Sequence, residues 1–133
     1  TKVHGVHLGK NDMDPAQARE YLGPHAIIGC TANTAADITS LAGLDIDYIG
    51  LGPFRHTDTK ANLAPVIGLE GYRRIMAEIR AAGIELPVVA IGGITSADVT
   101  PLLQAGASGV AVSGAILRAN DPVRETSTII NGN

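Results

Sequence analysis

Five short apolar runs alternate with segments of helical character along this sequence, and this alternation limits the folds that the chain can adopt. Each run is bounded by Gly or Pro, as β-strands usually are. Strands that alternate with helices are typical of βα units on a parallel sheet. The runs cover residues 4–9, 26–31, 46–52, 87–92 and 109–113. The sequence therefore predicts an α/β protein.

Most of the intervening helices carry clear signals at their ends. Asp-Pro pairs at 14–15 and 121–122 each place a side-chain acceptor before a proline in the first helical position. Segments 34–43 and 69–83 have apolar residues at spacings of three and four, and both end on Gly. We expect a helix at each of these four places.

The helix predicted over residues 96–106 contains a proline in its interior. Pro101 lies too deep for the first turn, and a proline there removes a backbone donor. We therefore expect a separate turn at the start of this segment and a helix that restarts near Thr100.

Two α/β architectures fit this pattern. The units average 133/5, or roughly 27 residues, so a closed eight-unit barrel of about 200 to 250 residues needs roughly 80 more. The chain also starts without Met, inside a predicted strand. We expect residues 1–133 to be the C-terminal portion of a single (β/α)8 TIM barrel domain, with about five βα units present and the three N-terminal units upstream. An open doubly wound sheet, which needs no further residues, is the alternative.

Composition and charge argue against several classes of function. A hydrophobic content of 45% with 17% charged residues suits a buried core rather than disorder. The net charge is −3 and no Lys/Arg run with interleaved aromatics is present, which disfavours nucleic acid. The apolar runs are far shorter than the roughly 20 residues that span a bilayer, and nothing resembles a signal peptide. We predict a cytoplasmic protein without nucleic-acid or membrane partners.

The loop after the third run carries groups suited to a phosphate. In parallel α/β proteins, reactive groups collect in loops after the carboxyl ends of strands. Residues 53–60 end in Thr57, Asp58, Thr59 and Lys60, which offer hydroxyl donors, an ammonium group and backbone N–H groups. The sequence predicts a phosphate or pyrophosphate site here; a polar surface loop is the alternative.

Glycine-containing loops follow the last two runs. Gly92-Gly93 and Ser113-Gly114 let the backbone approach a ligand closely. The ends of the last two strands are the usual phosphate site of (β/α)8 barrels. We expect both loops to converge on one anion, unless these glycines serve only tight packing between strand and helix.

A carboxylate follows the first run at the same edge. Asp12 lies three residues past Gly9, where it could hold Mg2+ that bridges to phosphate oxygens. A surface charge is the alternative for Asp12. Asp14 is better explained as a helix cap.

The histidines and the single cysteine suggest no catalytic pair. His4 and His7 differ by three positions on one strand, so we expect them on opposite faces and unable to chelate one metal. We interpret His25 and His56 as surface residues, and Cys30 as core packing.

Taken together, these segments resemble the thiamin phosphate synthase family over essentially the whole chain. Seven motifs match in order and spacing, which makes the match specific although no single motif is. They are GVHLG at 5–9 followed by Asp12, IGCTANT at 28–34, DYIGLGP at 47–53, TDTK at 57–60, GLEG at 68–71, PVVAIGGIT at 87–95 and AGASGVAVSGAI at 105–116.

The resemblance implies a transferase of thiamine biosynthesis on a (β/α)8 barrel. The family joins a pyrimidine methyl diphosphate to a thiazole phosphate, with Mg2+, and releases pyrophosphate. By resemblance, Asp12 is the second of two Mg2+ aspartates, Thr31 contacts the pyrimidine, and Lys60 holds its diphosphate; Lys60 and Thr31 are the expected catalytic residues. The residues expected to hold the thiazole phosphate are Thr57, Asp58, Thr59, Gly93, Ser113 and Gly114.

Two other activities stay open. A sister thiazole tautomerase shares the fold but uses a His where this chain has Asn33, and a catalytically silent barrel would only bind a phosphorylated ligand. The chain also departs from the family at Thr31, where Ser is commoner, at Arg55-His56, and at Ser113-Gly114. The partners expected are phosphorylated small molecules and, through an open sheet edge, a possible second copy of the chain.

Overall fold

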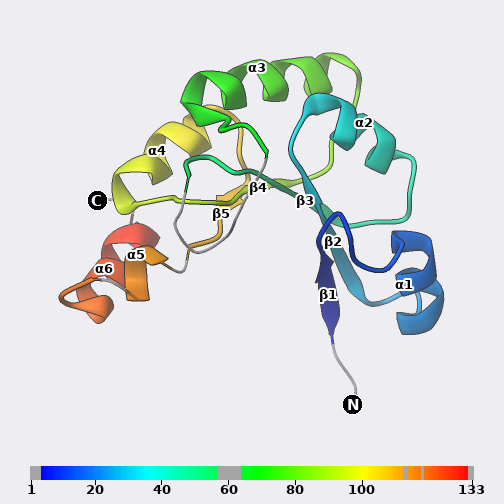
Figure 1. Cartoon of the computed structure of the whole chain (residues 1–133), viewed down its shortest axis with the longest axis horizontal. Coiled ribbons are helices and arrows are strands. Elements are labelled where there is room, and N and C mark those ends of the chain that lie inside the picture. Colours follow the sequence, from blue (N-terminus) through cyan, green and yellow to red (C-terminus); the bar gives the residue numbers. More distant parts are fainter. Residues whose placement is uncertain (1–3, 57–63, 113, 118, 132–133) are drawn as a thin grey trace.

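A curved sheet of five parallel strands forms the framework of the protein (Figure 1). The computed structural model describes residues 4–56, 64–112, 114–117 and 119–131. Neighbouring strands pair in the order in which they occur along the chain, β1-β2-β3-β4-β5. The strands are β1 (Gly5–Leu8), β2 (Ile27–Ala32), β3 (Tyr48–Leu51), β4 (Val88–Ala90) and β5 (Gly109–Val110).

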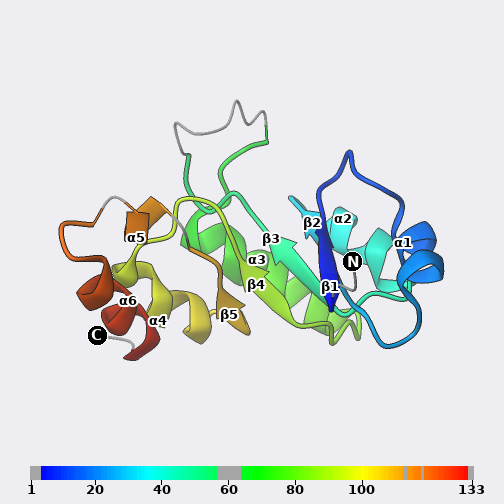
Figure 2. The same cartoon turned by 90° about the horizontal axis from the view of Figure 1, so that it is seen from below.

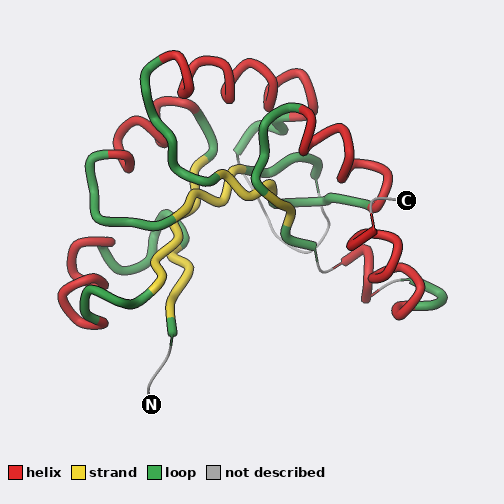
Figure 3. The backbone as a smooth tube through the Cα atoms, turned by 180° about the vertical axis from the view of Figure 1, so that it is seen from behind, coloured by secondary structure: helices red, strands yellow, loops and turns green. Residues whose placement is uncertain are grey.

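The first four helices lie along the outer side of the curved sheet, so one layer of helix covers one layer of strand (Figures 1 and 3). A doubly wound sheet reverses its strand order at a switch point and has helices on both faces. The unbroken order and one-sided cover are instead those of a barrel wall. The helices are α1 (Pro15–Leu22), α2 (Ala35–Ala42), α3 (Gly68–Ala81), α4 (Ser96–Gln104), α5 (Gly114–Leu117) and α6 (Pro122–Asn131).

The apolar core fills the space between the helices and the outer face of the sheet. Every second residue of a strand points to this side, so each strand contributes alternate side chains. In β2, for example, Ile28, Cys30 and Ala32 are all buried. The largest fully buried side chains are Tyr72, Ile28, Ile38, Ile49, Leu51, Ile79, Leu102 and Val88. Within each strand, the residues that alternate with the buried ones face the inner, concave side of the sheet.

The predicted helix starts are confirmed by their caps. The Asp14 carboxylate accepts hydrogen bonds from the backbone N–H groups of Ala16 and Gln17 at 3.1 and 3.4 Å, with Pro15 as the first helical residue. Asp121 accepts one from Arg124 N–H at 3.1 Å. In each case the side chain satisfies donors that the helix itself cannot.

The predicted interruption of the fourth helix is wrong. α4 runs from Ser96 to Gln104 with Pro101 inside it. Pro101 has no N–H to donate to the carbonyl four residues earlier, yet the helix continues because burial of Val99 and Leu102 holds it against the sheet. Tertiary packing here outweighs the local preference.

The last strand is shorter than predicted. β5 comprises Gly109–Val110 instead of the expected 109–113, although Ala111 still donates to the carbonyl of Ala90 at 2.9 Å. Among the described residues, no helix is long and apolar enough to cross a membrane.

Candidate functional site

The loops after the strands gather at one edge of the sheet, because all five strands run in the same direction. The loop after β1 and the described parts of the loop after β3 rise on the same side of the molecule (Figure 2). This edge carries the predicted site residues that lie within the described part of the chain.

Asp12 lies in a tight turn after β1. Its carboxylate accepts a hydrogen bond from Gly9 N–H at 2.7 Å, and its own N–H donates to the Gly9 carbonyl at 3.1 Å. The carboxylate is therefore held at the edge of the sheet by its own turn, and the side chain is exposed. Asp14, by contrast, is engaged as the cap of α1, as predicted.

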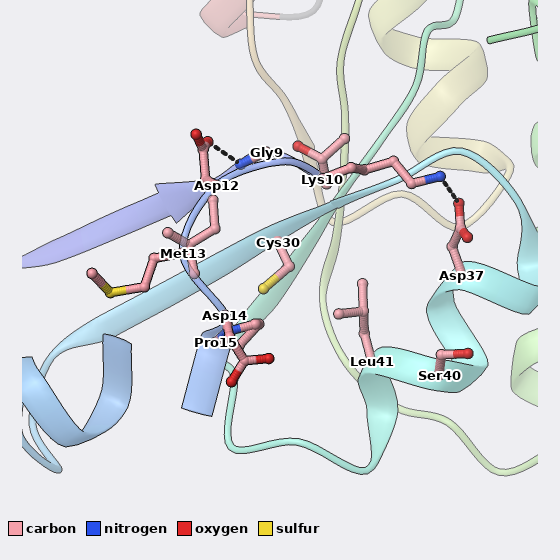
Figure 4. Close-up of a pocket in the computed structure, with 12 residues that line it drawn as sticks. Gly9, Lys10, Asp12, Met13, Asp14, Pro15, Cys30, Asp37, Ser40 and Leu41 are labelled. Atoms are coloured by element: carbon pink, nitrogen blue, oxygen red, sulfur yellow. Dashed lines mark hydrogen bonds and ion pairs between the residues drawn. The ribbon is translucent and has the colours of Figure 1, made fainter. Parts of the chain in front are cut away.

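Asp12 and Thr31 line one cavity of about 350 Å³ between the β1–α1 loop and α2 (Figure 4). The two residues are 19 positions apart in the sequence, and the pairing of β1 with β2 brings them together. Lys10 reaches across the cavity to the carboxylate of Asp37 on α2 at 2.9 Å. Cys30 and Leu41 form an apolar part of the wall.

Two hydrogen bonds fix the Asp37 carboxylate in its ionised form. Burial alone would raise the pKa of Asp37, but the hydrogen bond from Asn33 N–H at 2.9 Å and the Lys10 ammonium outweigh it and lower that pKa. The ammonium and the carboxylate thus neutralise each other across the cavity.

The residues present offer a partial fit to Mg2+. Within the described ranges, no group of three His, Cys, Asp or Glu side chains could enclose a metal ion. Mg2+, however, commonly binds through one or two carboxylates while substrate phosphates and water complete its shell. The exposed Asp12 carboxylate suits one such ligand position.

The sequence interpretation missed His7 and Tyr48. On the concave face, His7 Nε2 lies 2.9 Å from Thr31 Oγ1, and His7 Nδ1 lies 2.9 Å from the Tyr48 hydroxyl. The predicted substrate residue Thr31 is therefore one end of a three-residue chain that crosses β1, β2 and β3. The sequence interpretation gives His7 no role because it expects His4 and His7 on opposite faces of one strand.

Two glycines make this arrangement possible, and they are the signal that could have found it. A Cβ at Gly29 would lie 1.9 Å from Cζ of Tyr48, and a Cβ at Gly50 would lie 2.8 Å from Cε1 of His7. Glycine inside a strand often marks the close approach of another group. Both glycines face the concave side, where the two rings lie over them.

Arg55 joins the loop after β3 to the loop after β4. Its guanidinium donates to the Gly93 carbonyl at 2.5 Å and to both carboxylate oxygens of Asp98 at 2.9 and 3.1 Å. Burial alone would raise the pKa of Asp98, but the hydrogen bonds from Arg55 and Thr95 outweigh it and lower that pKa. Arg55, one of the departures from the family pattern, thus has a structural role.

The glycine pair after β4 is required by packing. Gly92 and Gly93 have φ values of +90° and +70°, which favour glycine. A Cβ at Gly93 would lie 2.8 Å from the Arg55 carbonyl oxygen, and Arg55 N–H donates to the Gly92 carbonyl at 2.9 Å. The two glycines are therefore required by packing against the loop after β3, and not by packing between strand and helix. Their phosphate-binding role stays a prediction.

Asn33 connects the loops after β2 and β3. Its side-chain amide donates to the Gly52 carbonyl at 2.6 Å, next to the cis Gly52-Pro53 peptide bond. Asn33, at the position where the sequence resemblance would place the His of the sister tautomerase, thus binds the backbone of the neighbouring loop.

Several predicted site residues lie outside the described residues. These are Thr57, Asp58, Thr59, Lys60 and Ser113. Gly114 is the first residue of the short α5. The interpretations of His25 and His56 as exposed and of Cys30 as buried are confirmed, and burial raises the pKa of the Cys30 thiol.

The comparisons with known proteins agree on one family. The family model described as thiamine monophosphate synthase matches residues 1–116. The thiamine-phosphate synthase of Bacteroides thetaiotaomicron is 55% identical over 130 residues, which cover 98% of this chain and 62% of that protein. The thiamine-phosphate synthase of Flavobacterium johnsoniae is 50% identical over 117 residues, covering 88% of this chain and 55% of that protein.

Solved structures give the same result for the fold. Thiamine phosphate pyrophosphorylase from Pyrococcus furiosus matches with a TM-score of 0.81 and 34% identity, over 97% of this chain and 58% of that chain. Native KDPGal and 3-hexulose-6-phosphate synthase match with TM-scores of 0.68 and 0.66 at 13% and 15% identity, which is a likeness of fold alone. The chain spans less than two thirds of the length of each of these proteins, at 55–62%.

Proposed function

The chain belongs to the thiamine monophosphate synthase family, and from this premise we propose that its protein joins a pyrimidine methyl diphosphate to a thiazole phosphate, forming thiamin phosphate and releasing pyrophosphate. The observation that carries the proposal is the 55% identity with a thiamine-phosphate synthase over 130 residues. On this proposal the protein is a transferase of thiamine biosynthesis, with phosphorylated small molecules as its substrates.

The five βα units of this chain correspond, on the same proposal, to five consecutive units of a (β/α)8 barrel. The unbroken order of parallel strands and the helices on one side support this correspondence. The concave face that carries His7, Thr31 and Tyr48 would then face the barrel interior. A cytoplasmic location, and association of two copies through sheet edges, stay predictions from the sequence.

The positions of Thr31 and Asp12 suit the proposed chemistry. Asp12 lies in the turn after β1 and Thr31 lies near the end of β2, so both are at the carboxyl edge of the sheet, where barrel enzymes bind their substrates. Thr31 would contact the pyrimidine through its hydroxyl. Asp12 would be a ligand of Mg2+, which when bound neutralises charge on the diphosphate.

The proposed reaction requires stabilisation of the charge on the leaving pyrophosphate and does not require a nucleophile from the protein. The bond between the pyrimidine methylene carbon and the diphosphate oxygen breaks, and the thiazole nitrogen supplies the electron pair for the new carbon–nitrogen bond. Negative charge accumulates on the departing pyrophosphate, and the Lys60 ammonium would stabilise it. Thr57, Asp58, Thr59, Gly93, Ser113 and Gly114 would hold the thiazole phosphate. No covalent bond to the protein is required.

Asn33 is the observation that favours the synthase over the tautomerase. Its amide is bound to the Gly52 carbonyl, and an amide cannot exchange protons as an imidazole does. The loop after β2 therefore lacks the acid–base group that the sister activity uses.

The proposal is tested by incubating the purified protein with both substrates and measuring thiamin phosphate. We expect product only with a divalent cation, and we expect Lys60→Ala to lower the rate by about 100-fold or more. Arg74→Ala, which removes an exposed charge from α3, is the matched control and should leave the rate unchanged.

Four outcomes would overturn this assignment. Normal turnover by Lys60→Ala, or turnover unaffected by a chelator, contradicts the roles given above. Conversion of thiazole tautomers without coupling would favour the tautomerase. Binding of thiamin phosphate without turnover would favour a silent barrel.

A further inference from the structure

We infer that Tyr48 and His7 are positioning residues that fix the direction in which the Thr31 hydroxyl donates its hydrogen. The inference rests on the proposed function for the identity of the ligand that Thr31 meets. It rests on the concave face of β1, β2 and β3 for the arrangement itself.

The register of the strands aligns the three side chains. His7 is the partner of Gly29, and Gly29 is the partner of Tyr48, so one row across the sheet reads His–Gly–Tyr. The next row on the same face contains Thr31 and its partner Gly50. Because Gly29 has no side chain, the Tyr48 ring reaches across β2 to His7.

The geometry is that of a continuous hydrogen-bonded chain. The Tyr48 hydroxyl lies 2.9 Å from His7 Nδ1, and His7 Nε2 lies 2.9 Å from Thr31 Oγ1. The two rings are 5.5 Å apart between centroids and inclined by 30°. The single imidazole thus connects the phenol of β3 to the hydroxyl of β2.

Gly29 and Gly50 leave space on the concave face for the hydrogen-bonded side chains of His7 and Tyr48. An alanine at position 29 would overlap the Tyr48 ring at 1.9 Å, and one at position 50 would press on His7 at 2.8 Å. Glycine inside a strand is destabilising relative to alanine. Glycine at both positions, directly under the Tyr48 and His7 rings, therefore indicates that this face accommodates the two rings.

The direction of the hydrogen bonds follows from the chemistry of the groups. A neutral imidazole has one N–H donor and one acceptor nitrogen. Burial, and to a lesser extent Cys30, raise the pKa of Tyr48, so the phenol keeps its proton and donates it to Nδ1, the more basic partner. His7 Nε2–H then donates to Thr31 Oγ1.

The Thr31 hydrogen is left to point at the ligand. Within the described part of the chain, the Thr31 hydroxyl has no hydrogen-bond partner other than His7. With its oxygen already accepting from His7, Thr31 acts as a donor towards a ring nitrogen of the pyrimidine. On this inference, His7 and Tyr48 act on the ligand through Thr31.

The first test reads the histidine tautomer directly and needs no turnover. Two-bond nitrogen–proton NMR spectra of the 15N-histidine-labelled protein, with His7→Gln to assign the signals, should show His7 as the Nε2–H tautomer. Tyr48→Phe removes the donor to Nδ1 and should shift His7 towards a mixture of tautomers. Tyr21→Phe, on an exposed ring of α1, is the matched control and should change nothing.

The second test uses kinetics. Tyr48→Phe should lower kcat/KM for the pyrimidine substrate by about tenfold, the value of one hydrogen bond, with KM for the thiazole phosphate unchanged. Thr31→Val should lose at least as much, Thr31→Ser should retain most activity, and adding Tyr48→Phe to Thr31→Val should cost nothing further.

Three results would overturn the inference. The first two are an Nδ1–H tautomer of His7 and a His7 NMR spectrum that Tyr48→Phe leaves unchanged. The third is that the effects of Tyr48→Phe and Thr31→Val on kcat/KM multiply, because the effects of independent residues multiply. Absence of turnover in the unaltered protein would instead refute the proposed function while leaving the tautomer result standing.

Discussion

Replacing Gly29 by alanine tests whether the Tyr48 ring occupies the space that this glycine leaves open. The new Cβ would lie 1.9 Å from Tyr48 Cζ, whereas real Cβ contacts essentially never fall below 3.0 Å, so the ring must move. Overpacking of this kind costs about 1–3 kcal/mol. Loss of the bond between Tyr48 and His7 adds about 0.5–1.5 kcal/mol. The better backbone propensity of alanine returns about 0.5–1 kcal/mol.

The net expectation is a loss of roughly 2 kcal/mol in the free energy of unfolding. Urea unfolding followed by circular dichroism measures it, with an unchanged m-value as the sign that the comparison is valid. The same substitution in a Tyr48→Ala background should cost nothing or stabilise slightly, because the obstructing ring is gone. Gly43→Ala is the matched control, since no atom lies within 4 Å of its Cβ and its φ is −81°.

The outcome that would refute this reasoning is an equal cost of Gly29→Ala in both backgrounds. The clash would then lie with some group other than Tyr48, and the glycine would not be explained by the chain to Thr31. A loss as large at Gly43 would show that the effect belongs to any added methyl group.

The other predictions concern the ion pairs that hold the loops and the opposite edge of the sheet. Arg55→Ala should lower the free energy of unfolding by about 1–2 kcal/mol, a value reduced because Arg55 is half exposed. Arg55→Lys should retain only part of this stabilisation, because Lys lacks the two guanidinium nitrogens that bind Asp98. Wild-type stability of Arg55→Lys would contradict the role of those nitrogens. Because the pKa of Asp98 is lowered in the folded state, its carboxylate stabilises the protein above about pH 4 and this stability is lost as pH falls through the folded value. Asp98→Asn should therefore flatten the dependence of Tm on pH in the acid range, and an unchanged slope would argue against it. Arg19→Ala removes bonds to the Ala26 carbonyl and to Asp47, and should lower Tm without changing kcat; a change in kcat with an unchanged Tm would be evidence against a purely structural role.

The sequence by itself determined the elements of the fold, since these depend on neighbours in the chain. The Asp-Pro pair at 14–15 places a carboxylate within reach of N–H groups two and three residues on, so the start of α1 follows from local chemistry. The five strands were identified for the same reason, because apolar runs between glycines and prolines report local conformation and burial. The family, too, was recognised from motifs read along the chain.

The tertiary structure decided what depends on distant residues. The order β1-β2-β3-β4-β5 is that of a barrel wall and not of a doubly wound sheet, and it depends on which strands pair and not on the sequence of any single strand. The tertiary structure also kept α4 continuous through Pro101, because burial of Leu102 outweighs one missing hydrogen bond.

The polar chain on the concave face shows the same division most clearly. His7 and Thr31 are 24 positions apart and His7 and Tyr48 are 41 apart, so no local pattern brings them together. Only the register of three parallel strands places the rings over Gly29 and Gly50. The sequence named Thr31 as a site residue through its family, and the pairing of strands supplied the partners that orient it.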